Sequence, residues 1–308
     1  MAAYYCLMAG APSLALDSSP APITAAQFRQ DLDEEITPPD ARLLSYLYMQ
    51  QDALNTAALL ADADASVGDG GNYSEEQLRE MILCAQSTGA DAEGFPHFLC
   101  AFAQDYPTLC ERDGYYPKDD ILGRYYRWAL TCPNDKMRRW FSLCLNINNV
   151  LTALVAKNMG WNIGGYIQGA DAENLTSPSG EASGGSQGVE SADVAEMLLT
   201  NSAKDFGLST LYDWAEAAVR ISEEQNPTRK EQRIDALKWA WLDDNMMDDE
   251  FSVEAVFAYL CKLAMLQRWE LLDPQKGKET FTRIIEDLRG GAKVPAEFVA
   301  PTRGSVAR

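Results

Sequence analysis

Hydrophobic residues recur along this chain mainly at steps of three and four, the spacing that gives a helix one apolar face. After the pair Pro38-Pro39, this pattern continues through Leu59. The segment Ser74-Glu75-Glu76-Gln77 has the order of a capping box, which predicts that a new helix begins there. We expect further helices over residues 24–36, 96–105, 118–130, 134–159, 192–203, 209–225, 227–244, 252–272 and 274–288.

Alternation of apolar and polar residues with a period of two, which is typical of a half-buried strand, is nearly absent. The pattern therefore predicts an all-α fold, with at most a short strand in the apolar residues 1–9. Residues 177–188 are almost all small and polar, so they predict a flexible insertion. The expected organisation is a helical region over 1–170, an insertion over 171–190, a second helical region over 191–295 and a loose tail over 296–308.

The charge of the chain limits its partners. Among 308 residues, 26 Lys and Arg face 46 Asp and Glu, which gives a formal net charge of −20. This excess disfavours nucleic acid as a partner and repels an anionic membrane surface. The longest apolar stretches, 143–159 and 253–266, are too polar and too short for direct membrane insertion. Because the apolar start of the chain carries no Lys or Arg, we expect no export signal and a cytoplasmic location.

Little in the sequence supports catalysis. His97 is the only histidine, which disfavours Ser-His-Asp chemistry and zinc sites with several histidines, and we expect it to open a helix in a partly buried position. The seven cysteines form no C-x-x-C pair, so we expect buried thiols in a reducing compartment. No glycine-rich phosphate loop is present. We predict a protein that is not an enzyme and has no cofactor.

Two acidic segments are weak candidates for metal binding. The segment from Asp62 to Ser66 resembles the start of a calcium loop, but Val67 and Tyr73 stand where that loop needs a glycine and a bidentate glutamate. Five carboxylates between Asp243 and Glu250 could attract a divalent ion, although a solvated turn between helices explains them better. We therefore predict no metal site.

Two clusters of basic and aromatic residues run against the overall charge. One contains Arg138, Arg139 and Trp140, together with Arg124, Arg127, Trp128 and Lys136; the other contains Arg229, Arg233 and Trp239, together with Lys230, Lys238 and Trp241. Arg and Trp are enriched at interface hot spots, so the clusters could dock an acidic partner helix. Alternatively, the tryptophans belong to the core and the cations pair with nearby carboxylates. Helical spacing places Ile234, Leu237, Trp241 and Leu242 on one face and Trp239 elsewhere.

Several short segments spread over nearly the whole chain have a distinctive order. They are YYCLMAG at 4–10, GNYS at 71–74, WF at 140–141, LNI at 145–147, DFGLS at 205–209, IDALKW at 234–239, FAYLCKL at 257–263, RW at 268–269 and LD at 272–273. As a set, from Tyr4 to about Phe298, they resemble an uncharacterised bacterial family whose members are encoded among the subunits of V/A-type rotary ATPases.

A second resemblance is to the socket subunit of those ATPases, the all-helical protein between the central shaft and the proteolipid ring. It is carried by Asn149-Val150-Leu151, Ala156-Lys157, Gly160 and Tyr166-Ile167-Gln168-Gly169, which are similar to a repeated helix motif of the socket subunit. Thr152 and Val155 stand in the stretch where the socket subunit usually has an arginine, so the polar contacts of the motif differ here.

These resemblances imply a non-catalytic structural subunit of a V/A-type ATPase in the role of the socket subunit. Its expected partners are the central-shaft and proteolipid-ring subunits, and it would be peripheral to the membrane through that complex. The alternative is a cytoplasmic helical scaffold or assembly factor that acts on the ATPase transiently or on an unrelated target.

Overall fold

A computed structural model describes residues 4–16, 20–168 and 188–271 of the chain. Within these ranges every regular element is helical and no strand is present, which confirms the all-α prediction. The α-helices are α1 (Tyr5–Gly10), α2 (Ala25–Glu35), α3 (Pro38–Ala61), α4 (Glu75–Thr88), α5 (His97–Leu109), α6 (Pro117–Ala129), α7 (Asp135–Met159), α9 (Gly188–Thr200), α10 (Asp213–Ser222), α11 (Pro227–Met246) and α12 (Val253–Leu271).

Several helices begin where a capping side chain or a proline in the local sequence predicts a helix start. The capping box predicted at Ser74 is confirmed, because the Ser74 hydroxyl accepts the Gln77 N–H and the Gln77 side chain accepts the Ser74 N–H. Thr24 and Gln27 form a second capping box before α2. Helix α11 begins with Pro227 behind the cap Asn226, as the sequence predicts. Each of these signals lies within four residues, so they can be read from the sequence alone.

The beginning of the chain is a helix, and the short strand considered for residues 1–9 is wrong for the part described. Tyr4 anchors the segment, because its N–H donates to the Phe251 carbonyl at 2.8 Å and its hydroxyl donates to Asp40 at 2.6 Å. A strand needs a neighbouring strand to satisfy its backbone, whereas a helix satisfies much of it internally. With only helices nearby among the described residues, α1 is the conformation that leaves fewer groups unpaired.

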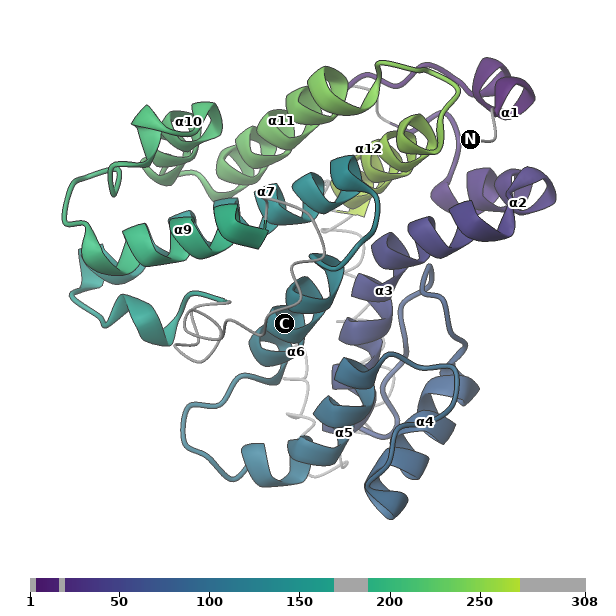
Figure 1. The fold of residues 1–308 in the computed structure, drawn as a ribbon, viewed down its shortest axis with the longest axis horizontal. Coiled ribbons are helices and arrows are strands. Elements are labelled where there is room, and N and C mark those ends of the chain that lie inside the picture. The colour runs from purple at the N-terminus through teal and green to yellow at the C-terminus, as the bar shows by residue number, and fades with distance from the viewer. Residues whose placement is uncertain (1–3, 17–19, 169–187, 272–308) are drawn as a thin grey trace, which may run out of the picture.

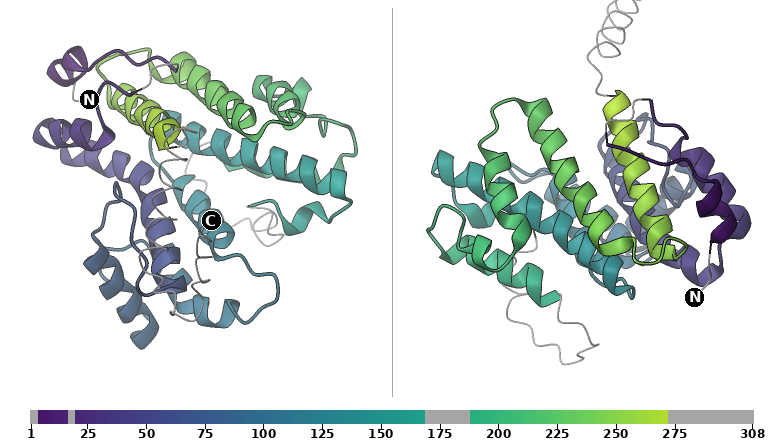
Figure 2. Two further views of the ribbon diagram at one scale, coloured as in Figure 1. Left: turned by 180° about the vertical axis from the view of Figure 1, so that it is seen from behind. Right: turned by 90° about the horizontal axis from the view of Figure 1, so that it is seen from above.

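Helix α7 lies between two groups of helices (Figures 1 and 2). It contacts α6, which precedes it in the chain, and α9, α10, α11 and α12, which follow it. Helix α3 packs with α4, α5 and α6, and α12 contacts α2, α3, α7 and α11. The long helix predicted over residues 134–159 therefore joins the two groups, as does α12, which contacts α2 and α3 as well as α11.

Two hydrophobic clusters hold these helices together. The larger draws on residues before and after the predicted insertion at 171–190, and Phe141 of α7 meets Phe257 of α12 edge to face with ring centroids 5.8 Å apart. The smaller joins the second half of α7 to α9 and α10 through residues such as Val150, Leu198 and Phe206. The predicted helix at 274–288 and tail at 296–308 lie outside the described residues, as does most of the insertion.

A tight turn before α10 positions Phe206 in the smaller cluster. Phe206 has a positive φ of 55° and is completely buried, and Gly207 follows with φ of 74°. The Asp205 carboxylate accepts the Gly207 N–H at 3.0 Å, and this bond, followed by one from the Ser209 side chain, lowers the pKa of Asp205 below its ordinary value.

Replacing Asp205 with alanine is expected to lower the free energy of unfolding by about 1 kcal/mol at pH 7, the usual net worth of such a hydrogen bond. Since the folded pKa lies below the ordinary value of 3.8, this contribution is complete above that value and disappears as pH falls through the folded pKa. Urea unfolding from pH 7 to pH 3 measures it, with Asp193→Ala on the exposed side of α9 as the control. A difference that persists unchanged at pH 3 would contradict this role for Asp205.

No helix in the described part of the chain is long and apolar enough to cross a membrane.

Candidate functional site

The two basic-aromatic clusters meet inside the protein. Trp140 of α7 is 5% exposed, and its ring centroid lies 5.8 Å from that of Trp241 on α11. Trp239, expected to point away from the apolar face, is 8% exposed, with the Lys262 ammonium 5.1 Å from its ring centroid. The reason is that α11 is covered by α10 and α7 as well as by α12, so it buries more than one face. The tryptophans therefore belong mainly to the core.

The arginines predicted for docking are largely engaged within the chain. Arg138 donates to the Cys132 carbonyl at 2.9 Å and to Asp135 at 2.6 Å, and Arg139 shares Asp135 at 3.0 Å. Arg233 lies 3.4 Å from Glu224. The Asn226 N–H, together with Arg233 and Arg229, lowers the pKa of Glu224. Arg229 itself is exposed beside the N-terminus of α11. Docking through these arginines stays a prediction.

Two lysines of the second cluster face a surface groove. The groove has a volume of about 610 Å³ and lies between α6, α7, α11 and the segment after α7. Lys230 and Lys238 line it, and neither forms an ion pair with any residue that the structure describes. We call this surface the aromatic groove and define it by Val155, Trp161, Tyr166, Lys230 and Lys238.

The aromatic wall of the groove follows the end of α7. Gly160 ends this helix in the left-handed conformation, with φ of 71°, and the Trp161 N–H donates to the Ala156 carbonyl at 2.8 Å. The chain thus reverses and places Trp161 against Tyr166, with ring centroids 5.3 Å apart and an interplanar angle of 28°. Both side chains remain about half exposed, at 51% and 50%. Large aromatic side chains this exposed are typical of interaction surfaces when they lie side by side.

A reciprocal pair of hydrogen bonds holds this segment on α7. The Asn149 amide donates to the Gln168 carbonyl at 2.8 Å and accepts the Gln168 N–H at 2.8 Å. Asn149 is 3% exposed, so the clasp is shielded from water. The sequence analysis named Asn149 and Gln168 within a motif that resembles the socket subunit, but it did not identify Trp161 as a site residue. A large aromatic residue directly after a helix-ending glycine was a usable signal.

A third cation of the groove, Arg268 of α12, is neutralised. It donates to Asp235 at 2.5 Å and lies 3.2 Å from Glu231. Trp269 also donates to Asp235 at 2.9 Å, and Asp235 is 3% exposed. This arrangement fastens α12 to α11 at the groove and leaves Lys230 and Lys238, among the described lining residues, as available positive charges.

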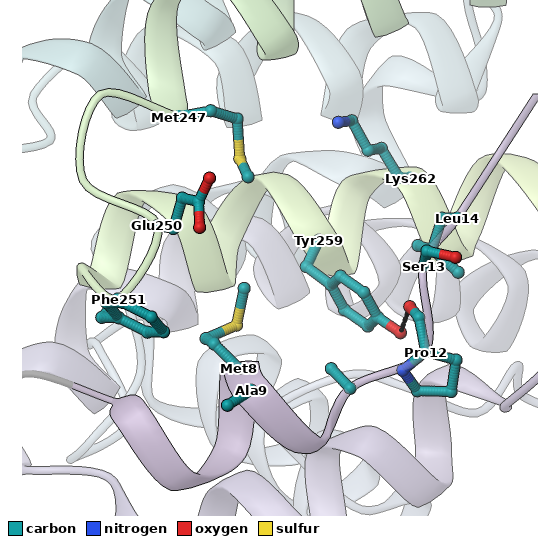
Figure 3. Close-up of a pocket in the computed structure, with 11 residues that line it drawn as sticks. Met8, Ala9, Pro12, Ser13, Leu14, Met247, Glu250, Phe251, Tyr259 and Lys262 are labelled. Carbon is teal, nitrogen blue, oxygen red and sulfur yellow. Dashed lines mark hydrogen bonds between the residues drawn. The ribbon is translucent and has the colours of Figure 1, made fainter.

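A second cavity of about 380 Å³ lies beneath the N-terminal segment (Figure 3). Met8, Met247 and Phe251 contribute to a largely apolar lining, and the Tyr259 hydroxyl donates to the Pro12 carbonyl at 2.8 Å. The Lys262 ammonium points away from Met8 and pairs with Asp243. No acid and base among the described lining residues converge on a common point, so the cavity offers packing space between α1 and α12.

The groups considered for catalysis or metal binding lie apart in the structure. His97 opens α5 as predicted, but the expectation of partial burial is wrong, because its side chain is 79% exposed and pairs with Asp91 at 2.9 Å. It occupies the first helical position and its side chain stays exposed, whereas Phe98 and Leu99, the next residues of α5, are buried. All seven cysteines are free, and Cys100, Cys132, Cys144 and Cys261 are buried. Within the described ranges, no three His, Cys, Asp or Glu side chains gather as metal ligands.

The comparisons with known proteins identify a family. Residues 1–292 match the family described as "Protein of unknown function (DUF2764)", so the chain belongs to this family. No curated protein and no solved structure matches the chain. The fold and the groove are therefore the basis on which a function can be argued.

Proposed function

We propose that this member of the DUF2764 family is a non-catalytic structural subunit of a V/A-type rotary ATPase, in the role of the socket subunit that links the central shaft to the proteolipid ring. The observation that carries the proposal is the position of the motif that resembles the socket subunit. Asn149 and Gln168, near its two ends, clasp each other, and Leu151, Ala156 and Tyr166 line the aromatic groove. The residues that carry the resemblance therefore help to build an exposed surface with stacked aromatic rings.

The packing of α7 supports a mechanical role. Its buried residues run from Met137 to Ala156, and it contacts helices of both groups. Close-packed interiors have low compressibility and transmit strain. A force applied at the groove, at one end of α7, would pass along this helix into α12 and α11 without any covalent step. The net charge of −20 makes anionic lipid repel the subunit, so its contact with the ring is made through protein loops.

Co-purification tests this function. A tagged copy of the full chain, extracted with native membranes in mild detergent, is expected to retain shaft, ring and catalytic-head subunits through size exclusion in a constant ratio. A control extraction with 1 M salt separates surface adsorption from assembly, because salt screens exposed charge pairs. Recovery without any ATPase subunit would refute the proposal, and recovery only with immature subcomplexes would instead identify an assembly factor.

A further inference from the structure

We infer that the aromatic groove receives an acidic, amphipathic α-helix of a partner protein. Taking this partner to be a central-shaft subunit rests on the proposed function, whereas the chemistry of the helix follows from the groove itself. The groove combines an apolar wall with two separated positive charges, and an occupant must match both features. Of the two carboxylates that also line it, Glu231 pairs with Arg268 and Asp119 lies on α6, away from the two lysines of α11.

The apolar wall needs side chains of some size. Val155 is 42% exposed, and the stacked rings of Trp161 and Tyr166 continue the same surface beyond the end of α7. An apolar stripe on a helix would cover this surface and remove it from water, which is the main favourable term in association. Residues 177–188 of the chain itself are too small and polar to provide such a stripe.

The lysines set the charge pattern of the occupant. Lys230 and Lys238 lie eight positions apart on α11, which corresponds to about 12 Å along the helix axis at 1.5 Å per residue. A helix lying along α11 would meet both lysines if it carried Asp or Glu about two turns apart, flanking its apolar stripe. Residues 272–308 do contain Glu279 and Glu286 seven positions apart, but their seven Lys and Arg against five Asp and Glu make the segment net positive and a poorer complement to the lysines than a net acidic helix. A cross-link from position 155 to this segment would therefore overturn the inference. A second copy of this chain carries the same net charge of −20 and is repelled at long range.

The test places the photo-cross-linking amino acid benzoylphenylalanine at Val155 in the full-length tagged protein within native membranes. The matched control carries it at Leu83, which is 69% exposed on α4 and outside the groove. Irradiation is expected to link position 155, but not position 83, to a central-shaft subunit. Mass spectrometry of the linked peptide is expected to find a helix-forming sequence with acidic residues seven or eight positions apart.

Charge reversal supplies the second readout. Lys230→Glu with Lys238→Glu is expected to reduce the cross-link about tenfold or more, because the acidic helix then meets like charges. Arg42→Glu with Arg112→Glu changes the net charge equally at exposed positions outside the groove and is expected to leave the cross-link intact. Circular dichroism and thermal melting establish that both variants fold.

The outcomes separate this inference from the proposed function. Suppose that ATPase subunits co-purify but position 155 gives no cross-link, or links to a basic peptide, to lipid or to a second copy. This result would overturn the inference and leave the proposed function standing. A different result would overturn the function and support the inference. In that case no ATPase subunit co-purifies, position 155 links to an acidic amphipathic helix of another protein, and the lysine reversal abolishes this link. Equal loss in both charge variants would count against the groove.

Discussion

Replacing Asp52 with alanine is expected to lower the free energy of unfolding by about 3 kcal/mol, because three partly buried N–H donors would lose their buried acceptor. Asp52 lies on α3 and is 0% exposed. Its carboxylate accepts the Asn72 N–H at 2.8 Å, the Asn72 side-chain amide at 2.8 Å and the Tyr73 N–H at 3.1 Å. These bonds fasten the loop between α3 and α4, and Arg29 completes the attachment by donating to the Gly71 carbonyl at 2.8 Å. Urea unfolding followed by circular dichroism measures the loss.

The control for this loss is Asp69→Ala, which removes an exposed carboxylate from the same loop and is expected to change stability by less than about 0.5 kcal/mol. Gly71→Ala probes the same contact from the other side, since a Cβ there would lie 2.2 Å from an Asp52 carboxylate oxygen. Equal unfolding midpoints for Asp52→Ala and Asp69→Ala would mean that the carboxylate does not hold the loop.

Asn149→Ala is expected to reduce association with the partner about tenfold while the protein remains folded, since weakening the aromatic wall removes a pre-organised hot spot. The Asn149 side chain makes both hydrogen bonds that hold Gln168, so its truncation frees the segment that carries Trp161 and Tyr166. The measurements are the ratio of shaft protein to tagged protein after co-purification, and hydrogen–deuterium exchange of residues 160–168.

Asn158→Ala is the matched control, because Asn158 is exposed on the last turns of α7 and does not line the groove. Faster exchange in Asn149→Ala alone, together with weaker association, is the expected pair of results. Faster exchange with undiminished association would show that the wall is held by Asn149 but is not used for docking. Unchanged exchange would contradict the clasp itself.

The sequence predicts most helices correctly because their starts depend on neighbouring residues. Ser74 and Gln77 are three positions apart, and Pro227 directly follows its cap. Predictions that depend on packing between distant segments were less accurate. Trp239 is buried because α12 covers it, and that contact cannot be read from helical periodicity within α11. Helix α10 begins at Asp213, later than expected from Ser209, because a short 3-10 helix at Leu208–Thr210 precedes it.

The aromatic groove could not be predicted from the sequence either, because it too depends on packing between distant segments. Trp161 and Tyr166 become neighbours through the reversal at Gly160 and the clasp between Asn149 and Gln168, which joins positions 19 residues apart. Lys230 reaches this wall from a helix that follows much later in the chain. Of the second cluster, Lys230 and Lys238 line the groove, whereas Arg233 pairs with Glu224. Docking through this cluster stays a prediction.

Electron cryo-microscopy of the intact V/A-type ATPase, purified through a tag on this chain, tests the central claim most directly. We predict one well-ordered copy between the central shaft and the proteolipid ring, with an acidic shaft helix against Trp161 and Tyr166 and its carboxylates at Lys230 and Lys238. A complete complex in which the position between shaft and ring is filled by another protein, or in which this chain leaves the aromatic groove open to solvent, would contradict it.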